Sequence, residues 1–318
     1  MEGKYFIVYC EEAGKNLMIS KLCDSAYIEI NRVYPFLKVA RLKYEWLEDV
    51  EDPYVYIKML KGRADIFTFW QRPPDIKPKY DFPFEWDNMA VLIIKSYKFW
   101  WEKQINKKTR NMVRKSQKMG VKVLCSPLTD DFIRGIVKIY NETPIRQNKP
   151  FRHYGKTFEQ VKEKFSILPT KYKEDFIGAY YNNELIGFIH LIYSGKCALI
   201  SQILSMIKHR DKAPNNALIA KTVEVCASKG IKFLIYERMS AGSLGEFKQN
   251  NGFIKLYVPR YYVPLSFKGK LAIYFNLHKG IKGFLPDKVK DYLRPKRNYL
   301  FKVAFRSKRI RKILKILV

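Results

Sequence analysis

The stretch DFIGAYYNNELIGFIHLIYSGKCALISQILSMI, residues 175–207, is rich in β-branched and aromatic residues. It divides at two pairs of turn-forming residues, Asn182-Asn183 and Ser194-Gly195, into three apolar runs, Asp175–Tyr181, Leu185–Tyr193 and Ala198–Ile207. Short connections of this kind join neighbouring antiparallel strands. The stretch therefore predicts a three-stranded antiparallel meander.

The flanking sequence predicts elements on both sides of the meander. Before it, a β-branched run is followed by two helices whose N-caps are threonines; these are Val121–Cys125, Thr129 and Thr157. After it, a helix that begins near Asn215 and ends before Gly230 leads to the continuous apolar run Ile231–Tyr236. Such a run predicts a buried parallel strand. A short helix at Ser243–Asn250 and a last strand pair at Phe253–Val263 complete the predicted unit.

This order, strand, two helices, meander, helix, strand, helix, strand, resembles the GNAT superfamily of N-acyltransferases. The closing pattern at Phe247, Lys248, Gly252 and Phe253 is similar to the Fem-type branch, the aminoacyltransferases that build peptidoglycan cross-bridges and their FemAB-like relatives. The resemblance implies a mixed α/β GNAT-like fold. It also implies direct attack of an amine on an activated acyl group, without a covalent enzyme intermediate.

Four segments are expected along the chain: 1–97, 98–120, 121–265 and 266–318. The first contains candidate strands at Tyr5–Cys10, Tyr54–Met59, Ile66–Trp70 and Met89–Ile94. Fem-type enzymes carry two GNAT-like halves, so the resemblance implies that residues 1–97 are a reduced, degenerate half. The acyltransferase-like unit itself is predicted to span residues 121–265.

The charge balance is strongly basic, with 60 Lys and Arg against 30 Asp and Glu and a net charge of +30. Such a surface attracts polyanions, which include nucleic acid, anionic lipid and phosphate-rich substrates. Between Lys98 and Lys122 the basic residues far outnumber Glu102, the one acidic residue. This segment is interpreted as a solvated connecting helix, with a track for tRNA or a phosphorylated substrate as the alternative.

The segment 266–318 is predicted to be a basic, amphipathic C-terminal extension. Its last turns place four aliphatic residues on one face, with Arg and Lys around them: Ile310, Ile313, Leu314 and Leu317. This pattern is typical of a helix that lies on an anionic bilayer. A terminal helix that packs on the protein and offers its basic face to RNA is the other interpretation, and both stay open.

The five cysteines include no C-x-x-C pair, which indicates neither a disulfide framework nor a metal site. The short apolar run Tyr5–Cys10 is followed by Glu11 and Glu12, unlike a signal peptide, and no apolar stretch reaches membrane-spanning length. The sequence therefore predicts a cytoplasmic protein, peripheral on the inner face of the membrane if the C-terminal helix meets lipid.

Three residues are candidates for catalysis. Glu237 and Tyr236 lie at the end of the predicted parallel strand, where a general base or an amine-binding group is expected in an open α/β sheet. An ion pair with Arg238 is the structural alternative for Glu237. His190 lies in the middle of a strand between Ile189 and Leu191, a setting more typical of a hydrogen-bonded core histidine, and it is a secondary candidate.

The donor is expected to bind at the end of the meander and the start of the next helix, through Gln202, Arg210, Lys212, Asn215 and Asn216. The family's pyrophosphate loop matches here at Arg210, but its two small-residue positions are occupied by Ala213 and Asn215. This departure favours aminoacyl-tRNA, or another activated acyl group, over acetyl-coenzyme A. No permanently bound cofactor is expected.

The acceptor is expected to bind to a loop dense in hydrogen-bond donors, at Arg146, Gln147, Lys149, Arg152, His153 and Tyr154. The family pattern implies a phosphate contact for Lys248 as well. These residues predict an anionic acceptor, such as a phosphorylated sugar or a lipid-linked group. An ordinary basic surface loop is the structural alternative, because composition does not show that these groups converge.

Two function classes follow from the sequence. The favoured one is a FemAB-like N-acyltransferase that transfers an aminoacyl or other acyl group to an amine on a cell-envelope or sugar-nucleotide acceptor. The alternative is a catalytically inactive GNAT-fold protein that binds RNA or associates with a membrane. The donor-rich loop and Glu237 favour the enzyme, whereas the altered pyrophosphate loop and the excess positive charge favour the binding protein.

Overall fold

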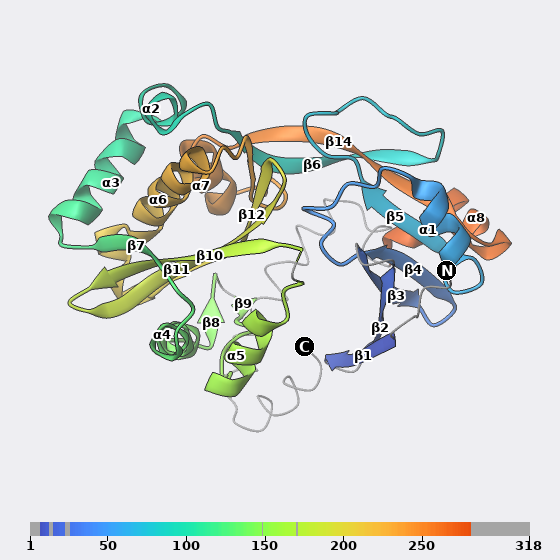
Figure 1. Ribbon diagram of the computed structural model, residues 1–318, viewed down its shortest axis with the longest axis horizontal. Coiled ribbons are helices and arrows are strands. Elements are labelled where there is room, and N and C mark those ends of the chain that lie inside the picture. The colour runs from blue at the N-terminus through green and yellow to red at the C-terminus, as the bar shows by residue number, and fades with distance from the viewer. Residues whose placement is uncertain (1–6, 13–14, 23–25, 148, 170, 281–318) are drawn as a thin grey trace. The chain divides into compact units, whose positions relative to one another are not determined.

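A computed structural model describes residues 7–12, 15–22, 26–147, 149–169 and 171–280 (Figure 1). The chain divides into two compact units. Unit 1 comprises Met1–Asp87, Ile145–Arg152 and Val258–Val318, and unit 2 comprises Asn88–Pro144 and His153–Tyr257. The amphipathic helix predicted around Ile310–Leu317 lies outside the described residues, so its contact with membrane, RNA or protein stays a prediction.

Unit 2 contains a mixed sheet. Its strand order is β6, β13, β12, β11, β10, β7, and the bounds are Phe84–Ile93, Phe233–Ile235, Cys197–Ser205, Glu184–Ser194, Lys173–Tyr181 and Lys122–Ser126. All neighbours are antiparallel except β12 and β13, which are parallel. The predicted meander is thereby confirmed as β10, β11 and β12, and the predicted parallel strand is confirmed as β13.

Helices cover both faces of this sheet (Figure 1). They are α2 (Tyr97–Phe99), the π-helix η2 (Trp100–Gln104), α3 (Lys107–Lys118), α4 (Asp130–Asn141), α5 (Phe158–Ser166), the 3-10 helix η3 (Ile207–Lys212), α6 (Pro214–Ser228) and α7 (Ser243–Asn250). As predicted, the side chains of Thr129 and Thr157 cap α4 and α5. The last predicted strand pair is wrong, because residues 254–264 form one long strand, β14 (Ile254–Pro264).

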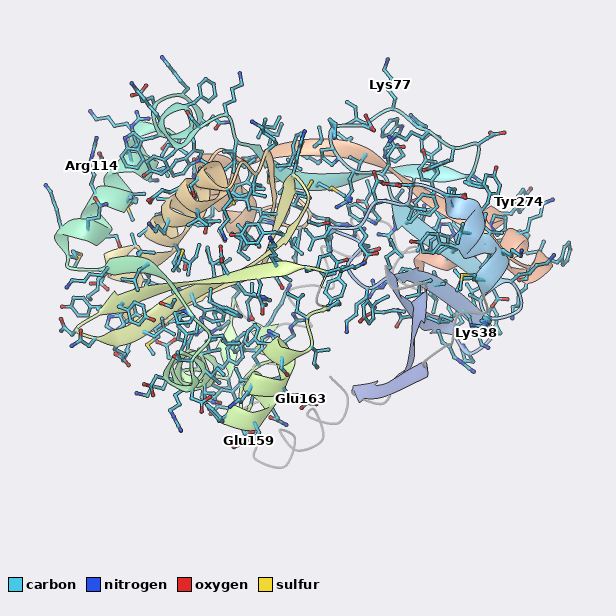
Figure 2. The ribbon with its side chains drawn as sticks, viewed as in Figure 1. Lys38, Lys77, Arg114, Glu159, Glu163 and Tyr274 are labelled. Carbon is cyan, nitrogen blue, oxygen red and sulfur yellow. The ribbon has the colours of Figure 1, made fainter. Side chains whose placement is uncertain are left out.

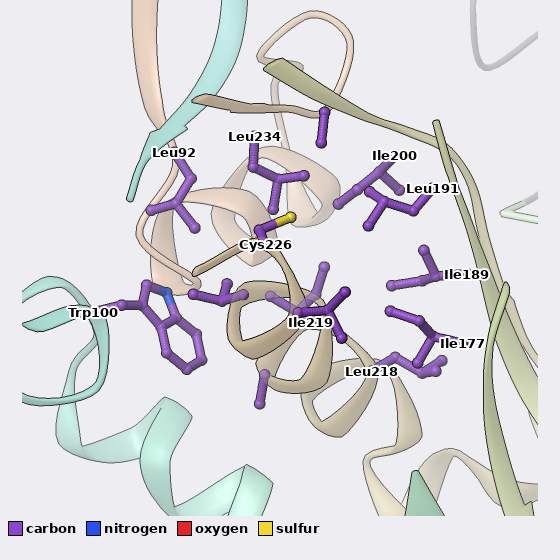
Figure 3. Packing of buried hydrophobic residues seen from close by; sticks show 14 of the residues in the cluster. Leu92, Trp100, Ile177, Ile189, Leu191, Ile200, Leu218, Ile219, Cys226 and Leu234 are labelled. Atoms are coloured by element: carbon purple, nitrogen blue, oxygen red, sulfur yellow. The ribbon is translucent and has the colours of Figure 1, made fainter. Parts of the chain in front are cut away.

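The main core of unit 2 lies between the sheet and α6. Three residues of α6 pack against four aliphatic residues of the strands: Leu218, Ile219 and Cys226 against Ile177, Ile189, Leu191 and Ile200 (Figure 3). Trp100 belongs to the same buried cluster. On the opposite face, Phe132 of α4 and Phe165 of α5 make edge contacts with Phe176. Each fully buried aliphatic or aromatic side chain contributes roughly 1.5–3 kcal/mol. Both faces of the central strands are therefore apolar, as the continuous runs in the sequence predict.

In unit 1 the strands are hydrogen-bonded in the order β1, β2, β3, β4, β5, β14. The bounds are Ile7–Glu12, Lys15–Leu22, Ala26–Tyr34, Leu37–Leu42 and Ile66–Trp70, followed by the Val258–Pro264 part of β14. Only β4 and β5 are parallel, and helix α1 (Pro53–Leu60) connects them along the chain. Unit 1 also includes α8 (Phe267–Tyr274), η4 (Leu277–Lys279) and the small hairpin β8 (Ile145–Arg146) and β9 (Lys149–Pro150).

The strand predicted at Tyr54–Met59 is wrong, because these residues belong to helix α1. The Asp52 side chain accepts a hydrogen bond from the Tyr54 N–H, and Pro53 occupies the first helical position. An N-cap followed by proline is a strong helix-start signal, and here it outweighs the β-branched and aromatic content. The strands predicted at Ile66–Trp70 and Met89–Ile94 are confirmed as β5 and part of β6.

Two strands carry the chain from one unit to the other. β6 follows β5 of unit 1 along the chain, but its residues Val91–Ile93 pair with β13 of unit 2. β14 follows β13 of unit 2, but its residues Arg260–Pro264 pair with β5 of unit 1. The neighbour of β13 in unit 2 is therefore the strand that follows β5 of unit 1 along the chain. The neighbour of β5 in unit 1 is likewise the strand that follows β13 of unit 2.

Within the described residues, no helix is both long enough and apolar enough to cross a membrane. The same residues hold no group of three or more His, Cys, Asp or Glu side chains that is suited to a metal ion.

Candidate functional site

The parallel strands β12 and β13 pair over three residues and then part. The paired residues are Cys197 with Phe233, Ala198 with Leu234 and Leu199 with Ile235. Beyond Ile235 the chain stays bonded to β6 on its other side, since the Tyr236 N–H donates to the Ala90 carbonyl and the Ala90 N–H donates to the Glu237 carbonyl. β12 continues to Ser205 without a parallel partner. The two strands are thus parallel neighbours whose pairing ends well before the end of β12.

The exposure of β12 changes where the pairing ends. Cys197 to Ile200 are buried, whereas Ser201 is exposed and Gln202 to Leu204 are partly exposed. The register between β11 and β12 also shifts here: His190 faces Gln202 and Leu191 faces Ile200, so that Ser201 is an extra residue. A bulge of this kind re-aims side chains and interrupts the ladder. The open edge leaves backbone polar groups of β12 available to an extended ligand.

A polar cluster lies beside this open edge, on the α4 and α5 side of the sheet. The Tyr140 hydroxyl donates to Gln202 Oε1 at 2.7 Å, and the Lys164 ammonium donates to the same oxygen at 2.6 Å. The His153 ring stacks on Tyr140 with a centroid distance of 4.7 Å. Gln202 and His153 were predicted, whereas Tyr140 and Lys164 were missed. In the sequence Tyr140 shares the helical spacing of the apolar residues Phe132, Ile133 and Ile136, and nothing local distinguishes Lys164 from a solvated lysine.

His190 lies in the core of this face. Its Nε2 lies 2.6 Å from Glu174 Oε2, its ring stacks on Phe176, and Phe165 contacts its edge. Burial holds the pKa of His190 below its usual value, in spite of the Glu174 carboxylate, which acts in the opposite direction. These contacts match the hydrogen-bonded core histidine that was the structural alternative for this residue.

Glu237 and Tyr236 follow β13 at the point where the strands part. Glu237 is exposed and has a backbone φ of +48°, which is uncommon for a residue other than glycine. Burial, together with the neighbouring Glu237 charge, raises the pKa of the Tyr236 phenol well above its usual value. Tyr236 therefore stays protonated at neutral pH. Backbone strain of this kind is common at functional sites.

Lys248 fixes the turn that carries Glu237. Its side chain is fully buried, and its ammonium donates to the carbonyls of Tyr236 and Arg238, at 2.6 and 2.7 Å. The ammonium also lies 4.1 Å from the centroid of the Tyr236 ring. Burial lowers the pKa of Lys248 to about 8, and the Glu237 charge partly opposes this. These contacts favour a positioning role for Lys248 rather than the phosphate contact that the family pattern implies.

The remaining residues of the Phe-Lys-x-x-x-Gly-Phe pattern hold the end of α7. Gly252 has a φ of +88°, and a Cβ atom there would lie 3.3 Å from the Trp100 indole nitrogen. That indole N–H donates to the Asn251 carbonyl at 3.0 Å. The Phe253 ring packs edge-on against Tyr236. Contacts at the end of α7 therefore connect this helix with the segment Tyr97–Gln104 and with the turn that carries Glu237.

The predicted donor loop forms η3 and the start of α6. Ala213 is left-handed, with a φ of +51°, and precedes Pro214 at the first helical position. The Lys212 ammonium pairs with Asp211 at 3.1 Å, and Arg210 is exposed. Upstream, the Glu142 carboxylate accepts the N–H groups of Ile207 and Lys208, at 2.7 and 2.9 Å. A carboxylate therefore already occupies two backbone donors of this loop.

The predicted acceptor loop is divided between the units. Arg146, Gln147, Lys149 and Arg152 belong to unit 1, whereas His153 and Tyr154 belong to unit 2. Arg146 and Lys149 lie on the β8–β9 hairpin, and the Arg146 guanidinium lies 4.9 Å from the centroid of the Phe151 ring. The convergence of these side chains with Glu237 stays a prediction.

Comparison with known proteins identifies the fold. No protein-family model and no curated protein sequence matches this chain. Among solved structures, the C-terminal domain of a protein described as a lysylphosphatidylglycerol synthetase from Agrobacterium fabrum is similar over 82% of this chain and 88% of its own, with a TM-score of 0.53 and 12% identity. L-PGS from Bacillus licheniformis is similar over 82% and 87%, with a TM-score of 0.52 and 14% identity.

FemX is a third similar structure, over 85% of this chain and 90% of its own, with a TM-score of 0.52 and 9% identity. The chain therefore has a mixed α/β, GNAT-like fold, and it spans most of the length of each of these structures. At these identities the likeness establishes the fold alone. The expected fold class is confirmed, whereas substrate and chemistry have to be argued from the residues.

Proposed function

We propose that the protein is a FemAB-like N-acyltransferase, which transfers an aminoacyl or other acyl group from an activated donor to an acceptor amine. The parting of β12 and β13 beyond Leu199 and Ile235 carries this proposal. It combines an exposed strand edge with an exposed carboxylate, Glu237, at the end of the shorter strand. The similarity to FemX and to L-PGS supports the same class of reaction.

In the proposed mechanism the acyl carbonyl lies along the open edge of β12. Backbone N–H groups of the segment Ser201–Leu204 polarise the carbonyl oxygen, and the acceptor amine attacks the carbonyl carbon. Glu237 accepts the proton that the amine loses, directly or through one water molecule. The tetrahedral intermediate then collapses, and the leaving oxygen or sulfur of the donor departs with a proton. The Tyr236 phenol, which is protonated at neutral pH, is the proposed source of that proton, and the proton that Glu237 accepted then restores the phenol through a water molecule.

Aminoacyl-tRNA is the donor that we favour. The Glu142 carboxylate, which caps the Ile207 and Lys208 amides, competes with a pyrophosphate at those two groups. Helix α3, by contrast, exposes five cations along its surface: Lys107, Lys108, Arg114, Lys115 and Lys118. We expect tRNA binding to weaken steeply with salt, and replacement of Lys107, Lys115 and Lys118 by alanine to lower both the affinity and the salt slope. Stabilisation by acyl-coenzyme A, with no tRNA binding, would instead assign the donor to the α6 start.

The acceptor is proposed to be an anionic amine-bearing molecule of the cell envelope or a sugar nucleotide. Within unit 2, His153 and Tyr154 are the loop residues proposed to contact its phosphate or sugar groups. The side chains of Lys164 and Tyr140, which both donate hydrogen bonds to Gln202, supply further polar groups on the α4 and α5 side of the open edge.

A transfer assay tests the proposal. Purified protein is incubated with tRNA charged with radiolabelled amino acids and with amine-bearing envelope precursors, and labelled acceptor is measured. We expect Glu237→Gln to lower the transfer rate by about 10²–10⁴-fold, because it removes the proposed base while keeping size and exposure. The matched control is Glu224→Gln on α6, a surface residue paired with Lys221. Equal rates for Glu237→Gln and wild type would remove Glu237 from the mechanism.

The second candidate function is a GNAT-fold protein without catalysis, which binds RNA or a membrane. The net charge of +30 and the occupied amides at Ile207 and Lys208 favour it. Salt-sensitive tRNA binding without transfer to any amine in the assay would support this function over the enzyme.

A further inference from the structure

Helix α8 of unit 1 packs Gly269, Ala272 and Ile273 towards the core and leaves its other large apolar side chains exposed to solvent. Phe267 is 76% exposed, Tyr274 78% and Phe275 57%, and Leu271 is exposed as well. Gly269 and Ala272 are buried instead. A Cβ atom at Gly269 would lie 1.9 Å from the Asp65 carbonyl oxygen, so this close approach requires glycine. Most of the large apolar side chains of this helix therefore face solvent, unlike those of an ordinary surface helix.

The exposed apolar residues form one face. Phe267, Leu271, Tyr274 and Phe275 are spaced by four, three and one residues, which places them on one side of a helix. Tyr274 projects away from the ribbon of α8 (Figure 2). Single exposed apolar residues are common on soluble proteins, but a contiguous group of large ones marks an interaction surface.

The position of α8 is well fixed, so the exposed face does not result from loose packing. The Ser266 hydroxyl accepts the Gly269 N–H at 3.0 Å and donates to the Asp65 carboxylate at 2.9 Å. Ala272 joins a buried cluster with Leu37, Val39 and Ile66 of the sheet. The aromatic face is therefore held outward by a rigid support.

Charge indicates which partner fits this face. The segment from Ser266 to Gly280 contains Lys268, Lys270 and Lys279 and no acidic residue. Lys268 bonds to Asp65 and Lys279 bonds to Glu85, whereas Lys270 is exposed beside the aromatic face. Aromatic rings with adjacent lysines are typical of helices that lie in the interfacial region of an anionic bilayer. The Tyr274 ring, with a polar tip on an apolar body, suits the same region.

We propose that α8 is a membrane-contact site, in which Phe267, Leu271, Tyr274 and Phe275 enter the headgroup region of an anionic lipid surface and Lys270 contacts lipid phosphates. The proposal concerns α8 and adds to the lipid contact that the sequence predicts for Ile310–Leu317. The inference does not depend on acyl transfer. A binding protein and an enzyme would both use α8 in this way.

Co-sedimentation with vesicles tests the proposal on the full-length protein. We expect binding to vesicles of equal parts phosphatidylglycerol and phosphatidylcholine, and much weaker binding to phosphatidylcholine alone. The combined variant Phe267→Ser, Tyr274→Ser, Phe275→Ser should bind the anionic vesicles at least about tenfold more weakly, because it removes the apolar area that enters the lipid. Lys270→Glu should weaken anionic binding several-fold. Tyr54→Ser on α1, which removes a ring that is 67% exposed, is the matched control and should bind like wild type.

Three outcomes would overturn the proposal. Equal sedimentation of the triple variant and wild type would assign lipid binding to another part of the chain. A wild-type dimer that the triple variant converts to a monomer in gel filtration would assign the face to a second copy. A large fall in the melting temperature of the triple variant would show that the protein's own chain covers these rings. Transfer to a soluble acceptor, measured on the same preparations, reports separately on the proposed function.

Discussion

Units 1 and 2 share one arrangement of strands but differ at the place where the parallel strands part. In each unit an antiparallel meander leads through a helix to a parallel strand: β4, α1 and β5 in unit 1, and β12, α6 and β13 in unit 2. Each parallel pair is three residues long. Two residues beyond the last pair, unit 2 has the exposed Glu237, and unit 1 has Trp70, which is buried.

In unit 1, Arg260 of β14 connects the end of β5 with the segment that follows β4. The Arg260 guanidinium donates to Thr68 of β5 at 3.0 Å and to Glu45, which follows β4, at 3.2 Å. It also lies 5.1 Å from the centroid of the Trp70 ring. In unit 2 the corresponding stretch of β12, Ser201–Leu204, is exposed or partly exposed. The same strand geometry is therefore filled by side chains in unit 1 and open in unit 2, where we propose that the substrate binds.

Filling the opening of unit 2 should have the largest effect. Ser201 is exposed, so Ser201→Tyr should fold normally, but its ring would occupy the proposed acyl position. We expect transfer to fall by at least about 100-fold, since a displacement of about 1 Å at a reacting centre has effects of this size. The rate of transfer and the melting temperature are measured together.

The control for this prediction is Lys43→Tyr in unit 1, two residues beyond the last β4 pair, as Ser201 is beyond the last β12 pair. It should leave transfer unchanged. Loss of transfer in both variants, or in neither, would break the comparison between the units.

Removing the charge network of unit 1 should cost stability rather than activity. Arg260→Met removes the closer of the two guanidinium groups that contact the buried Glu45, at 3.2 Å against 3.7 Å for Arg41, and it removes the contact with Asp87 at 3.9 Å. Breaking a buried ion pair by removing one partner costs about 3–5 kcal/mol. We expect a loss of about this size in the free energy of unfolding, measured in denaturant. Arg134→Met, at an exposed position of unit 2, is the control and should change it by less than about 0.5 kcal/mol. A stable Arg260→Met protein that has lost transfer would place chemistry in unit 1.

The sequence predicts unit 2 better than unit 1, for a physical reason. In unit 2 both faces of the meander are covered, so β10, β11 and β12 appear as continuous apolar runs between clear turns. In unit 1 the strand Ala26–Tyr34 carries Glu29, Asn31 and Arg32 among its apolar residues, and β3 and β4 were not predicted. The pairing of β6 with β13 and of β14 with β5 was also not predicted, because a local sequence pattern does not determine which strands pair.

The candidate site was predicted in part for similar reasons. Glu237 follows from its place after an apolar run, since the end of a parallel strand is a position that sequence can locate. The roles of Lys248, Tyr140 and Glu142 depend on contacts between residues distant in sequence, such as the bond from Glu142 to the Ile207 amide. Such contacts arise from packing and leave no local signal.

The buried lysine of unit 2 should make stability depend on alkaline pH. Burial lowers the pKa of Lys248 to about 8 in the folded protein, from an ordinary value of 10.5. Between these values the unfolded chain binds one proton more than the folded protein, so the free energy of unfolding should rise with pH. The slope is at most about 1.4 kcal/mol per pH unit. Lys248→Met should lack this rise, while Lys221→Met on the surface of α6 should keep it. Parallel pH profiles for Lys248→Met and wild type would contradict the assignment.

The buried histidine of unit 2 should have the smallest effect, on the acidic side. Burial holds the pKa of His190 below 6.5, so below that pH the unfolded chain binds a proton that the folded protein does not. The free energy of unfolding should therefore fall as the pH drops below 6.5, by at most about 1.4 kcal/mol per pH unit. His190→Gln, whose amide can still donate to Glu174, should flatten this part of the profile. It should leave transfer nearly unchanged, because the contacts of His190 with Phe176 and Glu174 support a core role. His278→Gln, at a buried histidine of unit 1, is the matched control for the loss of a buried imidazole. A large loss of transfer in His190→Gln with an unaltered pH profile would reverse the interpretation and make His190 part of the chemistry of unit 2.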